Sequence, residues 1–80
     1  MNNFQKLKER ILIMISWHQD DDVHGPYQMY STETFDTLRH AIYVAQTVDE
    51  IRDALLKNED LYSETGVLVM LETADPGDQL

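Results

Sequence analysis

Apolar residues recur at three- and four-residue steps along most of this chain, and this spacing favours packed amphipathic helices. In the first such segment the apolar stripe consists of Phe4, Leu7, Ile11, Met14 and Ile15. Asn2 or Asn3 can cap this segment, because an asparagine side chain accepts a hydrogen bond from the free amides of a first helical turn. The pattern predicts a helix over residues 2–17.

Two further segments carry the same spacing. Residues 32–46 follow an N-cap at Ser31 or Thr32, and their apolar stripe is Phe35, Leu38, Ala41, Ile42 and Ala45. The sequence Thr47-Val48-Asp49-Glu50 fits a capping box, in which the threonine and glutamate side chains bond to each other's backbone amides. A third helix is therefore predicted from Val48 to about Lys57.

Residues 58–73 fit two structures. Asn58 followed by Glu59 and Asp60 is typical of a helix N-terminus, which favours a fourth helix. Against this, the run Val67–Leu71 favours a strand, and a strand needs a partner for its backbone hydrogen bonds. We predict a mainly α fold, a single-domain bundle of three to four helices over residues 1–80. The alternative is an α+β fold in which residues 11–16 and 66–72 pair as two strands.

A loop is predicted between the first two helices, over residues 18–30. The triplet Asp20-Asp21-Asp22 has low helix propensity, and Gly25-Pro26 is typical of a turn. A connection of this length is unusual in a small domain and is often functional. At the other end of the chain, residues 75–80 are expected to fray.

Size and cysteine content limit the kinds of protein to consider. Eighty residues form one small core, and the absence of cysteine removes disulfides and thiolate zinc sites. The apolar run from Ile11 to Ile15 is shorter than a secretory signal or a membrane span requires. We expect a soluble, cytoplasmic protein with no membrane contact.

Charge is distributed unevenly along the chain. Residues 1–17 contain Lys6, Lys8 and Arg10 against Glu9, whereas residues 18–80 contain fourteen acidic residues against three basic ones. The formal net charge is −9. Such an excess repels nucleic acid and anionic membranes, and it attracts basic surfaces. A basic protein is therefore the expected partner, and direct binding of nucleic acid is not expected.

Catalytic and metal-binding patterns are weak. His18, Asp20, Asp22 and His24 have the side chains of a metal site, but a calcium loop would need a glutamate where Ser31 stands. The three glycines, at positions 25, 66 and 77, cannot build a phosphate-binding loop, and no nucleophile turn is recognisable. We predict no enzyme activity, no cofactor and no metal.

Acidic and aromatic residues are the candidates for partner binding. Asp49 and Asp53 lie one helical turn apart, at a spacing of about 5–6 Å, which is of the same order as the spacing of charges on nucleic acid. Aromatic side chains beside acidic ones suit a basic, partly apolar partner. The predicted partner-binding residues are Trp17, Asp20, Asp21, Asp22, Tyr27, Tyr30, Asp49, Asp53, Glu59, Asp60 and Glu64.

Two functions follow from these features. The first is inhibition of a nucleic-acid-binding protein by a polyanionic surface that mimics DNA or RNA. In its short length and acidity the chain resembles phage anti-CRISPR and anti-restriction proteins, and this resemblance implies action inside a bacterial host cell. The alternative is a helical regulatory or assembly module that binds a partner chain, or itself as a homodimer, through apolar helix faces.

Overall fold

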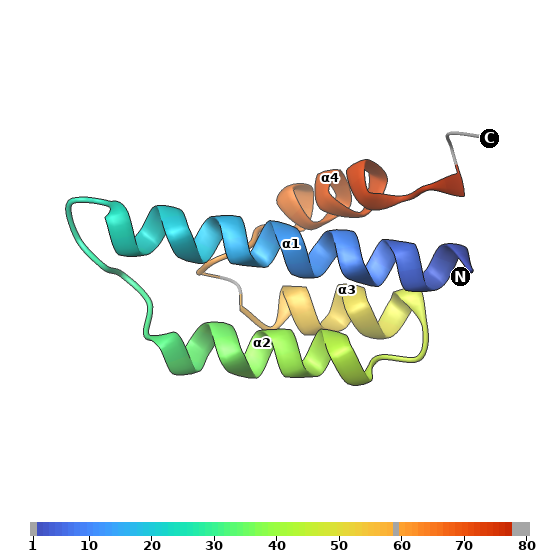
Figure 1. The fold of residues 1–80 in the computed structure, drawn as a ribbon, viewed down its shortest axis with the longest axis horizontal. Helices are drawn as coiled ribbons and strands as arrows, with labels where there is room; N and C mark the ends of the chain where they lie inside the picture. The colour runs from blue at the N-terminus through green and yellow to red at the C-terminus, as the bar shows by residue number, and fades with distance from the viewer. Residues whose placement is uncertain (1, 59, 78–80) are drawn as a thin grey trace.

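The computed structural model describes residues 2–58 and 60–77, which form four helices (Figure 1). These are α1 (Asn3–His24), α2 (Thr32–Val44), α3 (Val48–Leu56) and α4 (Glu64–Ala74). The long α1 packs against α2 on one side and α4 on the other, and α3 packs against both α2 and α4. The bundle measures 40 × 23 × 22 Å. The predicted fold class, a small mainly α bundle, is confirmed.

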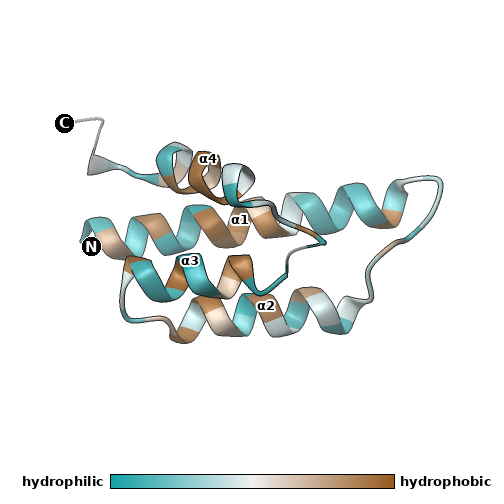
Figure 2. Ribbon diagram, turned by 180° about the vertical axis from the view of Figure 1, so that it is seen from behind, coloured by the Kyte–Doolittle hydropathy of each residue, from teal (hydrophilic) through white to brown (hydrophobic). Residues whose placement is uncertain are grey.

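One apolar core joins the four helices, and hydrophobic and hydrophilic residues alternate along them (Figure 2). The predicted stripes supply most of this core. Among the described residues no polar or charged side chain is buried. The largest fully buried side chains are Ile11, Ile15, Phe35, Leu38, Ile42, Ile51, Leu55 and Val67.

Side-chain caps fix where the helices begin. The Asn2 side chain accepts a hydrogen bond from the Gln5 amide at 2.8 Å, and Ser31 caps α2 in the same way. At α3 the predicted capping box is confirmed: Thr47 accepts from the Glu50 amide at 3.1 Å, and the Glu50 carboxylate accepts from the Thr47 amide at 3.2 Å. These bonds satisfy amides that would otherwise lack partners.

The first helix is longer than predicted, and the loop over residues 18–30 is correspondingly shorter. α1 continues through the aspartate triplet to His24, so the connection to α2 begins only at Gly25. The Asp22 carboxylate accepts hydrogen bonds from the backbone amides of Met29 (2.9 Å) and Tyr30 (3.1 Å). These tertiary contacts, together with those of His18, outweigh the low helix propensity of aspartate.

The fourth helix begins later than predicted, because Asn58 lies in the turn after α3 and does not cap α4. Its backbone carbonyl accepts from the amides of Leu61 and Tyr62, both at 2.9 Å, and its side-chain amide donates to the Ala54 carbonyl at 3.3 Å. Ser63 caps α4 instead, accepting a hydrogen bond from the Gly66 amide at 3.1 Å.

The alternative with two paired strands is wrong, because residues 11–16 and 66–72 both lie in helices. Val67, Met70 and Ala74 are buried at helical spacing, and this burial outweighs the β propensity of the run. After α4, the Asp75 side chain accepts from the Gly77 amide at 2.8 Å and Pro76 is buried, whereas residues 78–80 of the predicted frayed tail lie outside the described residues. None of the helices in the described part of the chain combines the length and apolarity needed to span a membrane.

Candidate protein-binding surface

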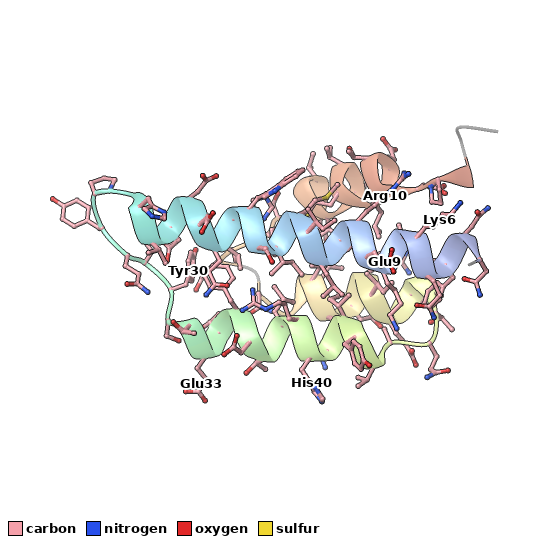
Figure 3. All side chains as sticks on the ribbon, in the orientation of Figure 1. Lys6, Glu9, Arg10, Tyr30, Glu33 and His40 are labelled. Carbon is pink, nitrogen blue, oxygen red and sulfur yellow. The ribbon has the colours of Figure 1, made fainter. Side chains whose placement is uncertain are left out.

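Five carboxylates gather where α1 finishes and α2 begins. We call this set the acidic end of the molecule, and Figure 3 shows Glu33 there, with Lys6 and Arg10 toward the opposite end. All five belong to helices that the core holds in place. The acidic end consists of Asp20, Asp21 and Asp22 in α1 and of Glu33 and Asp36 in α2.

The five carboxylates differ in their partners. Asp22 is partly buried and holds the α1–α2 connection, while Asp36 pairs with Arg39 at 2.6 Å. Asp20, Asp21 and Glu33 are exposed, and no ion pair to them occurs among the described residues. These three charges are therefore available to a partner.

The position of the aspartates in α1 is electrostatically unfavourable for the helix. Asp20 and Asp21 lie in its last turns, where the helix dipole disfavours negative charge. They also repel each other and the nearby carboxylates of α2. Neither side chain accepts a hydrogen bond among the described residues that would offset this cost. Folding therefore gives no reason for these two charges.

Basic side chains near the start of α1 are bound to helix ends instead. The Lys8 ammonium donates to the backbone carbonyls of Tyr43 (2.6 Å) and Ala45 (2.9 Å), and Arg10 donates to the Ala74 carbonyl at 3.4 Å. Cations at these C-terminal carbonyls are favoured by the helix dipole. Along α1, therefore, Lys8 and Arg10 near its start are engaged and the carboxylates Asp20 and Asp21 near its end have no ion pair among the described residues, while Glu72 and Asp75 line a pocket beside Leu7 near the basic residues.

The predicted aromatic residues have different environments. The side chains of Trp17 and Tyr27 are 62% and 81% exposed. Tyr30 is partly buried: its ring packs edge-on against Phe35, and its hydroxyl donates to the Asp60 carbonyl at 2.7 Å. Trp17 and Tyr27 are accessible to a partner, whereas Tyr30 joins the α1–α2 connection to the segment before α4.

The other predicted acidic residues are spread over α3, α4 and the segment between them. Asp49 pairs with Arg52 at 2.8 Å, so the Asp49–Asp53 row presents one unpaired carboxylate. Asp53, Asp60 and Glu64 are exposed, and Glu59 lies outside the described residues. Tyr30 brings Asp60 toward the acidic end, but Asp49 and Asp53 belong to a separate surface.

A groove between α1 and α2 is a feature that the sequence interpretation missed. Its volume is about 480 Å³, and we call it the α1–α2 groove. Three of its large side chains are exposed, namely Trp17, Tyr43 (71%) and Ile13 (49%). Ile13 and Trp17 lie four residues apart, on one side of α1 but outside the stripe that enters the core. This spacing is the sequence signal that could have revealed the α1 wall of the groove. The groove is lined by Leu12, Ile13, Ser16, Trp17, Arg39, His40 and Tyr43.

The residues considered for a metal site do not converge. Because residues two positions apart point to nearly opposite sides of a helix, His18 and Asp20 diverge once α1 extends through them. His18 Nδ1 instead lies 2.6 Å from the Tyr62 hydroxyl, and His24 Nδ1 lies 2.9 Å from the Asp20 carbonyl. Within residues 2–58 and 60–77, no three histidine or carboxylate side chains are placed to hold a metal ion.

The surroundings of His18 and Tyr62 change the pKa of both side chains. Burial lowers the pKa of His18, and the nearby Asp21 carboxylate partly opposes this effect. Burial also raises the pKa of Tyr62 to about 12. Both side chains are therefore neutral at pH 7.

Comparison of the chain with protein-family models, with curated proteins and with solved structures finds no match. Its function is therefore inferred from its own residues.

Proposed function

We propose that this protein is a small acidic interaction protein that binds a basic protein at the surface which that partner uses for nucleic acid. The observation that carries the proposal is the acidic end, where Asp20, Asp21 and Glu33 are exposed and unpaired. Two of these charges lie at a helix terminus that they destabilise, so a role in binding accounts for them better than a role in folding.

The separation of charge suits an oriented encounter. Ten residues of α1 separate Arg10 from Asp20, which is about 15 Å along the helix axis. A basic surface attracts the exposed carboxylates of the acidic end, so they accelerate association and favour an approach from that end. Exposed Trp17 and Tyr27 then supply apolar contact beside the charges.

Asp20, Asp21 and Glu33 present exposed carboxylates at one end of the molecule, and a groove that binds phosphates attracts such a group of negative charges. A nuclease or another nucleic-acid-binding enzyme presents such a groove. The proposal includes phage inhibitors of host defence, such as anti-CRISPR and anti-restriction proteins, and it places the action of the protein in the cytoplasm. The role is one of binding, without catalysis.

A second candidate function is self-assembly, which the exposed apolar side chains of the α1–α2 groove favour. In that case two copies would cover each other's grooves, at the cost of bringing two chains of charge −9 together. Sedimentation at several protein concentrations separates the two functions. A dimer that forms at micromolar concentration favours assembly, and a monomer favours the acidic interaction protein.

Capture of partners by the full chain at two salt concentrations tests the proposal. Captured proteins are expected to be basic, to bind nucleic acid, and to be released by raised salt or by competing duplex DNA. A captured protein, once purified, is expected to bind DNA more weakly when this chain is added.

Two charge-reversal variants provide the matched comparison. The first is Asp20→Lys/Asp21→Lys/Glu33→Lys, which leaves Asp22 and Asp36 in their structural contacts. The second reverses Glu9, Asp53 and Glu72, which are exposed elsewhere and give the same change in net charge. We expect capture to be lost in the first variant and kept in the second. Equal loss in both variants would show that net charge alone is responsible and would contradict the proposal.

A further inference from the structure

The α1–α2 groove has the features of a site for a helix. Two antiparallel helices form its walls, and large apolar side chains lie along it at one-turn spacing on α1. Single exposed apolar side chains are normal on a protein surface, but Ile13, Trp17 and Tyr43 are contiguous and line a concave surface. Amphipathic helices bind grooves of this kind through side chains spaced three and four residues apart.

The charges around the groove define the chemistry of its occupant. Asp20 follows Ser16 by one turn of α1, so an exposed carboxylate that has no ion pair among the described residues lies just beyond the groove. The cation within the groove is already engaged, because Arg39 donates to Gln19 and Asp36, both at 2.6 Å. A helix lying in the groove therefore meets apolar side chains along its length and negative charge at the acidic end.

We infer that the α1–α2 groove binds an amphipathic, basic helix of a partner protein, with its apolar face on Ile13, Trp17 and Tyr43 and its lysines or arginines toward Asp20. This inference rests on the proposed function and names the element of the basic partner that is recognised. A second copy of this chain fits the groove poorly, because its own charge of −9 opposes the approach to the acidic end.

Trp17 makes the binding directly measurable, because it is the one tryptophan of the chain and lines the groove. The probe is a synthetic peptide of leucine and lysine at helical spacing, added to the full chain at physiological salt. We expect the fluorescence of Trp17 to shift to shorter wavelength as the indole leaves water. A peptide of the same composition in scrambled order, and a leucine–glutamate peptide with helical spacing, are expected to bind at least about tenfold more weakly.

Exposed residues allow matched variants that keep the fold. Ile13→Ser and Tyr43→Ser should each weaken peptide binding about tenfold, because they remove contact surface from the groove. Leu68→Ser is the control, since Leu68 is 56% exposed on α4 and lies outside the groove. The Leu68→Ser variant should bind the peptide with the same affinity as the wild type. Circular dichroism should show the same helix content in Ile13→Ser, Tyr43→Ser and Leu68→Ser.

Each result then decides a different point. If the ordered basic peptide fails to bind, if the scrambled peptide binds equally well, or if Leu68→Ser weakens binding as much as Ile13→Ser, the inference is wrong. Formation of a dimer that Ile13→Ser abolishes would assign the groove to a second copy and would overturn the inference as well.

If Ile13→Ser weakens binding but reversal of Asp20, Asp21 and Glu33 does not, the groove is confirmed and the acidic-end proposal fails. If reversal of Asp20, Asp21 and Glu33 weakens peptide binding but Ile13→Ser does not, the acidic-end proposal stands and the inference about the groove is wrong.

Discussion

Nδ1 of His18 and the hydroxyl of Tyr62 lie 2.6 Å apart, and their rings are 5.3 Å apart between centroids. This hydrogen bond joins the second half of α1 to the residue before the N-cap of α4. It links two segments that are 44 residues apart in the sequence. The contact therefore holds α4 in register on α1, and it uses a histidine that sequence spacing had grouped with possible metal ligands.

Acidification is expected to destabilise the protein through His18. Because burial keeps the pKa of His18 below its ordinary value of 6.5 in the folded protein, the unfolded chain takes up the proton first as the pH falls. The stability that His18 contributes is present above pH 6.5 and is lost as the pH falls toward the lower folded-state pKa. Thermal unfolding followed by circular dichroism between pH 7.5 and 5 measures this loss.

Two glutamine variants isolate the contribution of His18 to this pH dependence. In His18→Gln the melting temperature should change less between pH 7.5 and 5 than in the wild type. His40→Gln is the control, because it makes the same substitution at an exposed position on α2. Identical pH profiles for the wild type and His18→Gln would rule out this coupling.

Removing the aspartate charges at the end of α1 should stabilise the fold. In Asp20→Lys/Asp21→Lys, two cations replace two anions beside the carbonyls of the last helical turns, where the helix dipole favours positive charge. The melting temperature at pH 7 and low salt is expected to rise by about 2–5 °C. Glu9→Lys/Asp53→Lys serves as the control for net charge and should give a smaller rise.

The combination of higher stability and lost partner capture in one variant would identify these charges as functional. A fall in melting temperature would instead show that the two aspartates support the fold. In that case their position would no longer be evidence for binding.

Helical periodicity predicted most of this fold, because the positions that it selected are the buried ones. Leu7, Ile11 and Ile15 on α1 enter the core. The capping box at Thr47 was also recognisable, since it depends on residues only three positions apart. Local patterns of this kind are visible in the sequence because the interactions that they describe are local.

The errors arose where distant contacts outweigh local propensity. The helicity of residues 18–24 depends on backbone amides that reach Asp22 from Met29 and Tyr30, and the late start of α4 follows the burial of Tyr62 against His18. The α1–α2 groove was missed for a related reason, because Tyr43 joins Ile13 only when α2 packs on α1. The spacing of residues within α1 alone or within α2 alone does not show that Tyr43 and Ile13 line the same groove.

Lys8 is expected to stabilise the end of α2. Its ammonium donates to the carbonyls of Tyr43 and Ala45, and it lies 5.4 Å and 5.9 Å from the ring centres of Phe4 and Tyr43. Lys8→Met keeps most of the apolar stem but removes both hydrogen bonds, which should lower the free energy of unfolding by about 1 kcal/mol. Urea denaturation measures the change. Lys6→Met is the control, and an equal loss there would show that the bonds of Lys8 contribute nothing specific.

Thr47 is expected to set the start of α3 and thereby the position of its core residues. Its side chain accepts from the Glu50 amide, and Ile51, Ala54 and Leu55 follow directly on the buried face. Thr47→Ala leaves that amide without its partner and should lower the free energy of unfolding by about 1 kcal/mol, or the melting temperature by about 4–8 °C. Thr37→Ala removes the same atoms from an exposed position inside α2, and it should change the melting temperature much less. Thr47→Ser, which retains the accepting oxygen, should keep most of the stability that Thr47→Ala loses.

If Thr47→Ser is as unstable as Thr47→Ala, the lost stability comes from the methyl group and the capping bond does not support α3.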